Sequence, residues 1–321
     1  MSEETLQLAQ KWADHQATDP PQPVELRDLL KMKMPERRWL LEGFMQERDI
    51  AMIHAYRGVG KSRFAQALGV AVASGGSFLR FEAPEPRQVL LVDGELPRED
   101  LQKMLAQAVA ASDSEPEAPL RVLSADLADA PLRSLATNEG RRQVEEHLGS
   151  AEFLILDNIS TLFLGSGPEN DSESWEKAQA WLLSLRRKGV ATLLVHHDGK
   201  GGAQRGTSKR EDVLSTVVQL KHPPDYEPSQ GARFELKFTK SRGMAGDAVV
   251  PLMVTLETPQ DGRPGWRWDF LNDSLGDRAG ELKALGMSVR DIAKELEASK
   301  SAVHRALQKR RVPVSRTHAQ G

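Results

Sequence analysis

The segment AYRGVGKS, residues 55–62, combines residue types that bind phosphate groups. Gly58 and Gly60 allow backbone N–H groups to approach phosphate oxygens closely. Lys61 supplies a positive charge to the terminal phosphates, and Ser62 supplies a hydroxyl that can bind Mg²⁺. An apolar run precedes the segment and a helical pattern follows it, which is the context that a phosphate-binding loop requires.

Ala55 stands where such loops usually begin with glycine, and the alternative is an ordinary strand-to-helix turn with a surface lysine. The strand before it and the helix after it favour the phosphate loop. The predicted nucleotide-binding residues are Ala55, Tyr56, Arg57, Gly58, Val59, Gly60, Lys61, Ser62 and Arg63.

Two carboxylates follow apolar runs downstream of this loop. FLILD ends in Asp157, the position of a carboxylate that holds Mg²⁺ together with Ser62. VLLVDGE ends in Glu95, which we predict to be the base that orients the attacking water. Each has a plainer alternative, because Asp157 could cap a turn and Glu95 could be an acid at a helix start.

The stretch LLVHHDGKGGAQRGTS, residues 193–208, carries two adjacent histidines and then a glycine-rich loop. Successive strand residues face opposite sides of a sheet, so His196 and His197 cannot easily chelate one metal ion. The chain has no cysteine to complete a zinc site. A surface loop or a part of the nucleotide site that senses phosphate remain the two other interpretations.

Short apolar runs alternate with helix-period segments through the first two thirds of the chain. The runs cover residues 49–54, 87–93, 120–126, 153–157 and 190–197. The helical segments cover residues 62–74, 97–112, 138–148 and 173–188. This alternation predicts an α/β fold, a parallel sheet covered by helices on both faces.

After Ser208 the pattern changes to period-two alternation, which predicts an antiparallel extension of the sheet. The four runs involved cover residues 213–221, 232–242, 249–257 and 265–270. We also predict one amphipathic helix over residues 4–16 and a proline-containing linker over 18–25. The expected domains are an N-terminal helix and linker (1–36), an ATPase domain (37–272) and a helix-turn-helix segment (277–321).

The composition excludes several classes of protein. Hydrophobic residues make up 39% of the 321 residues, enough for a large core. There is no cysteine for disulfides, no apolar stretch as long as a transmembrane helix, and no signal-like start, so we expect a cytoplasmic protein with no membrane partner. The net charge of −3 is uneven, because residues 278–321 carry ten Lys or Arg and four acids. A basic tail favours contact with nucleic acid over a solvated tail.

The C-terminal segment GMSVRDIAKELEASKSAVHRALQKRR predicts two short amphipathic helices joined by a tight turn. It resembles the helix-turn-helix pattern of resolvases and regulators, although a small protein-binding module has a similar pattern. We expect the second helix to contact duplex DNA, through base edges at its start and phosphates at its end. The candidate residues are Ser299, Lys300, Ser301, His304, Arg305, Lys309 and Arg310, with Arg311 beside them.

Residues 37–270 resemble the RecA-like ATPase core, in which the catalytic Glu follows the strand after the phosphate-loop helix, as Glu95 does. More narrowly, the chain resembles RepA-type hexameric replicative helicases of plasmids and mobile elements, a group of AAA_25-type ATPases. The motifs that carry this resemblance are RRWLLEG, VLLVDGE, LILDNIS, LLVHHDGKG, RGTS and FTKSRG.

The resemblance implies roles for further residues. His197 matches a polar residue that senses the γ-phosphate, and Lys200 lies in a loop, 198–204, that faces single-stranded DNA in a ring. Arg205 matches an arginine finger, and Lys240 and Arg242 match a Lys-x-Arg pair that acts across a subunit boundary. A plain glycine-rich loop and a solvated strand end are the alternatives. The earlier loop, GSGPENDSES, has three acids and no base, which departs from phosphate tracking.

The expected protein is a homo-oligomer, a hexamer by resemblance, that hydrolyses ATP with Mg²⁺ and acts on single-stranded and duplex DNA as a helicase. One alternative is a DNA-binding regulator switched by ATP. The other is a partition or recombination ATPase without unwinding activity.

Overall fold

The structure of the chain is a computed structural model. It describes residues 22–127, 130–164, 172–198, 212–258, 262–271, 279–280, 282–296 and 298–309. Contacts divide the chain between Arg37 and Arg38 into two units, the first of which contains the short helix α2 (Leu26–Leu29). The predicted helix over residues 4–16 lies outside the described residues.

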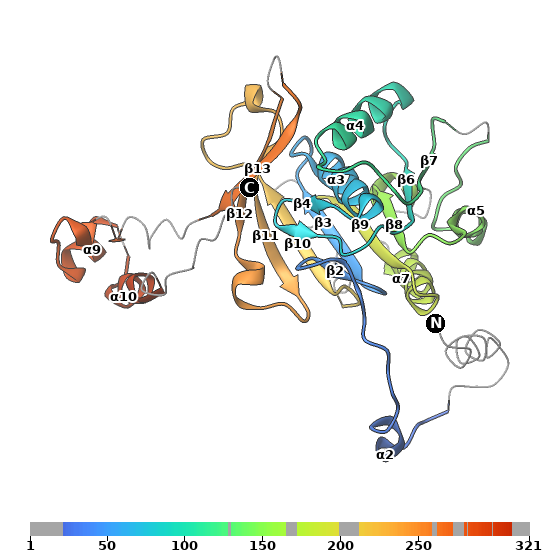
Figure 1. Cartoon of the computed structure of the whole chain (residues 1–321), viewed down its shortest axis with the longest axis horizontal. Helices are drawn as coiled ribbons and strands as arrows, with labels where there is room; N and C mark the ends of the chain where they lie inside the picture. Colours follow the sequence, from blue (N-terminus) through green and yellow to red (C-terminus); the bar gives the residue numbers. More distant parts are fainter. Residues whose placement is uncertain are drawn as a thin grey trace. The chain divides into compact units, whose positions relative to one another are not determined.

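One large sheet forms the centre of the second unit (Figure 1). Within the described ranges it has nine strands in the order β13-β12-β11-β10-β3-β9-β8-β6-β7. The strands from β10 to β7 are parallel to their neighbours, and β11, β12 and β13 continue the sheet in antiparallel fashion. The strands are β3 (Ile50–Ala55), β6 (Val89–Asp93), β7 (Leu120–Ser124), β8 (Phe153–Asp157), β9 (Ala191–His197), β10 (Thr216–Lys221), β11 (Arg233–Ser241), β12 (Leu252–Glu257) and β13 (Gly265–Phe270).

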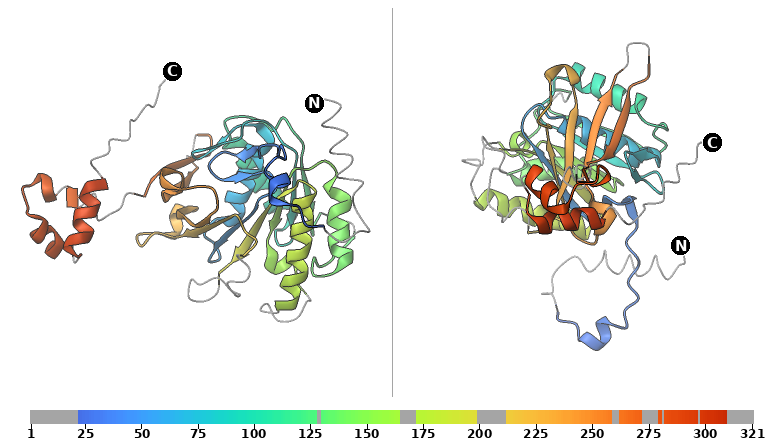
Figure 2. Two further views of the ribbon diagram at one scale, coloured as in Figure 1. Left: turned by 90° about the horizontal axis from the view of Figure 1, so that it is seen from below. Right: turned by 90° about the vertical axis from the view of Figure 1, so that its left-hand side faces the viewer.

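Helices cover both faces of the parallel strands, which is why β3, β6 and β8 are buried at every position. Apolar side chains of α3 and α4 pack on one face, and those of α5, α6 and α7 pack on the other. These helices are α3 (Lys61–Ser74), α4 (Arg98–Ala110), α5 (Asn138–Leu148), α6 (Ile159–Leu162) and α7 (Ser172–Arg187). Figure 2 shows α5 and α7 side by side, where Glu145 accepts hydrogen bonds from Trp181 and Lys188.

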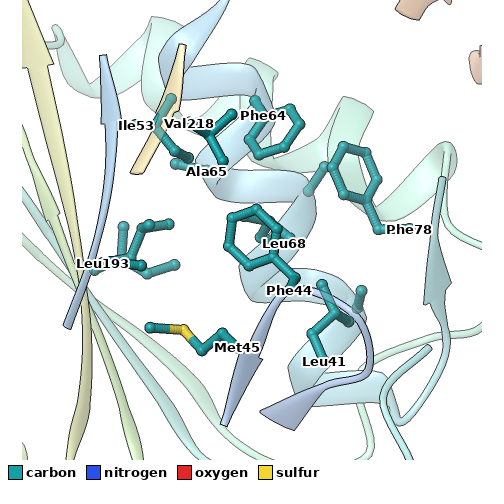
Figure 3. Close-up of a cluster of buried hydrophobic side chains, with 14 of the residues drawn as sticks. Leu41, Phe44, Met45, Ile53, Phe64, Ala65, Leu68, Phe78, Leu193 and Val218 are labelled. Atoms are coloured by element: carbon teal, nitrogen blue, oxygen red, sulfur yellow. The ribbon is translucent and has the colours of Figure 1, made fainter. Parts of the chain in front are cut away.

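The core beside α3 is rich in phenylalanine (Figure 3). Phe44 follows β1 (Trp39–Leu41) and precedes β2 (Met45–Gln46), and its ring lies 6.2 Å from that of Phe64 on α3. Phe64 in turn contacts Phe234 of β11, with ring centroids 6.1 Å apart. A further hairpin, β4 (Ser77–Phe78) with β5 (Phe81–Glu82), adds Phe78 at 5.0 Å from Phe64. These aromatic contacts, edge-to-face for Phe78 and Phe234 and tilted for Phe44, fix α3 between the sheet and both hairpins.

The predicted fold class, an α/β core with a mostly parallel sheet and an antiparallel extension, is confirmed. The prediction was wrong for the first strand of the extension, because β10 runs parallel to β3 and only its other neighbour, β11, is antiparallel. Period-two alternation reports which face a residue takes, not the direction of the neighbouring strand. Among the described residues, no helix is long and apolar enough to cross a membrane.

Candidate nucleotide site

The predicted phosphate loop joins β3 to α3. Gly58 and Gly60 have φ values of 81° and 117°, which lie in the region that favours glycine. A Cβ on Gly60 would also lie 3.3 Å from side-chain atoms of both Ala232 and Phe234. The loop therefore needs glycine here for its backbone path and for close packing against β11. Its main-chain N–H groups and the start of α3 form a typical anion-binding site.

Lys61 is buried and folds back into this loop. Its Nζ donates to the carbonyl oxygens of Ala55, at 3.1 Å, and Tyr56, at 2.9 Å. Burial lowers the pKa of Lys61 to about 8, and the nearby carboxylates of Asp157, Asp198 and Glu95 limit the decrease. Phosphate oxygens can replace the two carbonyls as acceptors, because a lysine ammonium is a mobile point charge on a flexible chain.

Asp157 ends β8 and lies opposite Asp93 of β6 in the sheet register. Its carboxyl group is buried and hydrogen-bonded to Ser62, and its Oδ2 atom has no hydrogen-bond partner among the described residues. Burial raises the pKa of Asp157 to about 7, with Asp93 and Glu95 adding to the increase and the Ser62 hydrogen bond opposing it. A buried carboxylate oxygen without a partner, next to a serine hydroxyl, fits Mg²⁺, which retains several waters and needs few protein ligands.

A tight turn after β6 presents Glu95. Asp93 Oδ1 accepts hydrogen bonds from the backbone N–H groups of Glu95 and Leu96, at 3.2 and 2.9 Å. The N–H of Gly94 donates to the carbonyl oxygen of Asp157 at 2.8 Å, which ties this turn to the end of β8. Asp93 is buried, and its pKa is raised by that burial although the two N–H groups oppose the shift. Its role is to shape the turn, while Glu95 remains half exposed at the rim.

Glu95, Asn158 and His197 meet above this turn. Asn158 Nδ2 donates to Glu95 Oε2 and lies 3.1 Å from His197 Nε2, which is 3.3 Å from the same carboxylate oxygen. Burial is the largest cause that lowers the pKa of His197; the Lys61 charge lowers it further, while Glu95 raises it. The imidazole is therefore neutral at neutral pH.

Asn158 was missed in the sequence. It follows the predicted metal carboxylate and caps α6, because its Oδ1 accepts from the N–H groups of Ser160 and Thr161 at 3.0 and 3.2 Å. An asparagine before a short apolar run is a helix-cap signal, so the cap could have been predicted. Its contact with Glu95 could not, because the two residues follow different strands and are 63 positions apart in the sequence.

The family of the chain follows from comparison with known proteins. The model of an AAA domain family, AAA_25, matches residues 15–203. The chain belongs to this AAA domain family. A comparison with curated proteins gives no match. Among solved structures, a KaiC-like protein of the hyperthermophilic archaeon Pyrococcus horikoshii OT3 is similar at 16% identity and a TM-score of 0.49, over 71% of this chain and 93% of that one.

Of the predicted site residues in this AAA domain chain, the structure brings together Lys61, Ser62, Glu95, Asp157 and His197. They lie at the carboxyl ends of β3, β6, β8 and β9, which are adjacent in the sheet. The described part of the chain holds no group of three or more His, Cys, Asp or Glu that could bind a metal by themselves. A metal held by His196 and His197 together is excluded on the geometry of the strand, since consecutive side chains face opposite sides.

Other residues predicted for the phosphate loop lie nearer the surface of the AAA domain. Tyr56, Arg57 and Gly58 are exposed, whereas Val59 is buried. Arg63 Nη1 donates to Gln107 Oε1 of α4 at 2.5 Å, so it packs between two helices.

The structure places Lys240 and Arg242 away from the phosphate loop of their own chain. Lys240 lies opposite Val217, which is level with Met52 of β3, three residues before Ala55. At about 3.3 Å per residue, that row is roughly 10 Å below the end of β3. Arg242 lies further along, where its Nη2 donates to the carbonyl oxygen of Asp212 at 2.9 Å. Both cations thus lie toward the end of the sheet opposite the phosphate loop.

The C-terminal helices α9 (Val289–Glu295) and α10 (Lys300–Lys309) pack through their own small core. Its buried members are Ala279, Ile292, Ala293 and Val303. Ser299 Oγ accepts from the N–H of Ala302 at 3.2 Å and lies 3.1 Å from Ser301 Oγ, so Ser299 caps α10. The predicted DNA contacts Lys300, Ser301, His304 and Arg305 are exposed. Lys200, Arg205, Arg310 and Arg311 lie outside the described residues, as do most of the loop 198–204, most of GSGPENDSES and the side chain of Lys309.

Proposed function

We propose that the chain hydrolyses ATP with Mg²⁺ and uses this activity on DNA. The observation that carries the proposal is the convergence of a phosphate loop, a buried carboxylate with an oxygen that has no partner among the described residues, and the Glu95–Asn158–His197 group at the ends of adjacent strands. Phosphoryl transfer requires such a set of groups: donors for the phosphates, a carboxylate for the metal and a base for the attacking water.

In this mechanism Lys61 leaves the carbonyl oxygens of Ala55 and Tyr56 and turns to the β- and γ-phosphates. Ser62 and Asp157 would hold Mg²⁺, which neutralises charge on the phosphates when bound. Glu95 accepts a proton from the attacking water, and Asn158 keeps its carboxylate oriented. His197, neutral and beside Glu95, donates or accepts a hydrogen bond at the γ-phosphate end of the pocket.

The full-length chain with ATP and Mg²⁺ tests this proposal through phosphate release and binding of an ATP analogue. Lys61→Ala should lose binding or turnover. Glu95→Gln should bind the analogue like the unmodified chain and lose nearly all turnover, because only the proton acceptor is removed. Glu146→Gln, an exposed acid of α5, is the matched control and should retain turnover. Full turnover in Lys61→Ala would refute the phosphate loop, and full turnover in Glu95→Gln would refute the assigned base.

We further propose that the active form is a homo-oligomer, a hexamer, in which Lys240 and Arg242, or Arg205, complete the site of a neighbouring chain. The position of Lys240 and Arg242 far from their own phosphate loop supports action across a boundary. A cation supplied in trans can raise the turnover by about 10³-fold or more. Mixing Glu95→Gln chains with Arg242→Ala chains tests this proposal. In a mixed oligomer, an Arg242→Ala chain supplies Glu95 and its Glu95→Gln neighbour supplies Arg242, so the site between them is intact and turnover should recover. No recovery at any mixing ratio would count against Arg242.

For the role on DNA, we propose a RepA-type replicative helicase of a plasmid or mobile element. The proposed division is a linker unit (1–36), the ATPase domain (37–272) and a DNA-binding segment (277–321). Exposed polar and basic side chains on a packed pair of helices support duplex contact through α10. Strand displacement from a forked duplex tests unwinding. ATPase activity stimulated only by a specific duplex, without displacement, would instead support the ATP-switched regulator.

A further inference from the structure

His54 and Asp198 form a buried pair beside the phosphate loop that the proposed mechanism does not use. The Nδ1–H of His54 donates to Asp198 Oδ1 at 2.8 Å, and both residues are at most 6% exposed. His54 precedes the last residue of β3, and Asp198 directly follows β9. A hydrogen bond between a ring N–H and a carboxylate in a buried environment is strong and directional.

A second contact ties the same two strands together. The backbone N–H of Asp198 donates at 2.9 Å to the carbonyl oxygen of Ala55, the first residue of the phosphate loop. Lys61 Nζ donates to this same oxygen at 3.1 Å. The end of β9 is thus fixed to the end of β3 by one side-chain hydrogen bond, to His54, and one main-chain hydrogen bond, to Ala55.

Asp198, the residue held by these two hydrogen bonds, is the immediate neighbour of His197. Ala55 lies opposite His197 in the parallel register, and consecutive residues face opposite sides of the sheet. The pair His54–Asp198 therefore lies on one side while His197 faces Glu95 on the other. Because Asp198 is bonded at both its backbone and its side chain, the backbone position that carries His197 is fixed relative to Lys61.

We propose that His54 and Asp198 are positioning residues for ATP hydrolysis, which hold His197 at the correct place across the γ-phosphate from Lys61. This inference rests on the proposed ATPase function and extends it to a pair that the mechanism above does not use. Phosphate binding occurs at the loop itself, so loss of the pair should affect turnover more than ATP binding. A displacement of a catalytic side chain by about 1 Å can lower the rate about 100-fold.

The test uses full-length variants that differ in one hydrogen bond. His54→Leu introduces an apolar side chain of similar length and removes the N–H donor. His54→Asn carries an N–H donor at the same number of bonds from the backbone as Nδ1, and so is the rescue variant. Thr192→Val is the matched control, because its buried hydroxyl on β9 has no hydrogen-bond partner among the described residues.

We expect His54→Leu to lower kcat by about 10- to 100-fold, the range for loss of a buried charged hydrogen bond, and to change the KM for ATP by less than about threefold. His54→Asn should recover most of the loss, and Thr192→Val should retain kcat. Asp198→Ala should reproduce the effect of His54→Leu, and gives a second test if the leucine variant does not fold. Because loss of folded chain would also lower the apparent kcat at an unchanged KM, kcat is expressed per site that binds the ATP analogue; a merely structural role would then leave kcat per binding site unchanged.

A double-mutant cycle identifies the residue through which the pair acts. If His54 works through His197, adding His54→Leu to His197→Ala should lower kcat no further. Single-turnover reactions with excess chain keep the slow variants measurable. Multiplied effects in the double variant, unchanged kcat in His54→Leu, or unchanged kcat in His197→Ala would each overturn the inference while leaving the ATPase intact. A wild-type chain that binds ATP without hydrolysing it would instead overturn the proposed function, and the inference with it.

Discussion

Replacement of Asn158 by aspartate separates two tasks that one side chain performs. Oδ1 of Asn158 caps α6, while Nδ2 donates to Glu95 and lies beside His197. The Asn158→Asp variant would retain the acceptor oxygen, and aspartate caps helices as well as asparagine does. The variant would lose the N–H donor and place a second carboxylate against Glu95, which raises the pKa of one member of the pair or separates them.

The structure sets the size of the expected effect. A hydrogen bond to a charged partner contributes about 1.5–3 kcal/mol, equivalent to about 10- to 150-fold in rate if the transition state loses all of it. The Glu95 side chain is 50% exposed, so water replaces part of what is lost. We therefore expect a decrease in kcat of about 10-fold for Asn158→Asp, at the lower end of that range.

Three measurements on Asn158→Asp and Asn158→Ala test this separation. Phosphate release at saturating ATP and Mg²⁺ gives kcat, analogue titration gives affinity, and thermal unfolding without nucleotide gives stability. Both variants should lose kcat with little change in affinity. Only Asn158→Ala should also lose the cap, at a cost of about 1 kcal/mol and about 2–4 °C in the unfolding midpoint.

The outcome that refutes the reasoning is a stable Asn158→Asp chain whose kcat stays within about twofold of wild type while Glu95→Gln is inactive. Glu95 would then act without the amide, and Asn158 would be a helix cap alone. An unfolding midpoint of Asn158→Ala equal to that of the wild-type chain would refute the other half, the assignment of the cap to Oδ1.

The remaining predictions concern pH, packing and the C-terminal segment. Because burial raises the pKa of Asp157 to about 7 and lowers that of Lys61 to about 8, Asp157 must lose a proton and Lys61 must keep one, so kcat/KM should fall below about pH 7 and above about pH 8. A flat profile across both values would contradict the assigned charges. Gly94→Ala should lower the free energy of unfolding by about 1–3 kcal/mol and lower kcat, since the added Cβ would lie 2.7 Å from a side-chain atom of α6; Gly265→Ala, with nothing within 4 Å, is the control in denaturant titrations. Truncation after Asp277 should retain basal ATPase activity and weaken duplex binding in a mobility-shift assay, and loss of ATPase activity would mean that the segment belongs to the core.

Local patterns in the sequence were sufficient for the parallel half of the sheet and for the phosphate loop. The loop was predictable because phosphate binding by backbone N–H groups demands glycines and a lysine at fixed short spacing. Asp157 and Glu95 were predictable as candidates because both stand at or just after the ends of buried strands, and strand ends in a parallel sheet share one edge. The direction of β10 was not predictable, because alternation along a strand is the same in either orientation.

The residue types and short spacings needed for phosphate and metal binding in this AAA domain chain can be read from the sequence, since those requirements act over a few residues. The tertiary structure set which side chains meet. Asn158 reaches both Glu95 and His197, and His54 reaches Asp198, 144 positions away. It also decided that Lys240 lies far from its own phosphate loop. These contacts depend on strand order and register, which arise from packing between distant segments and leave no local pattern.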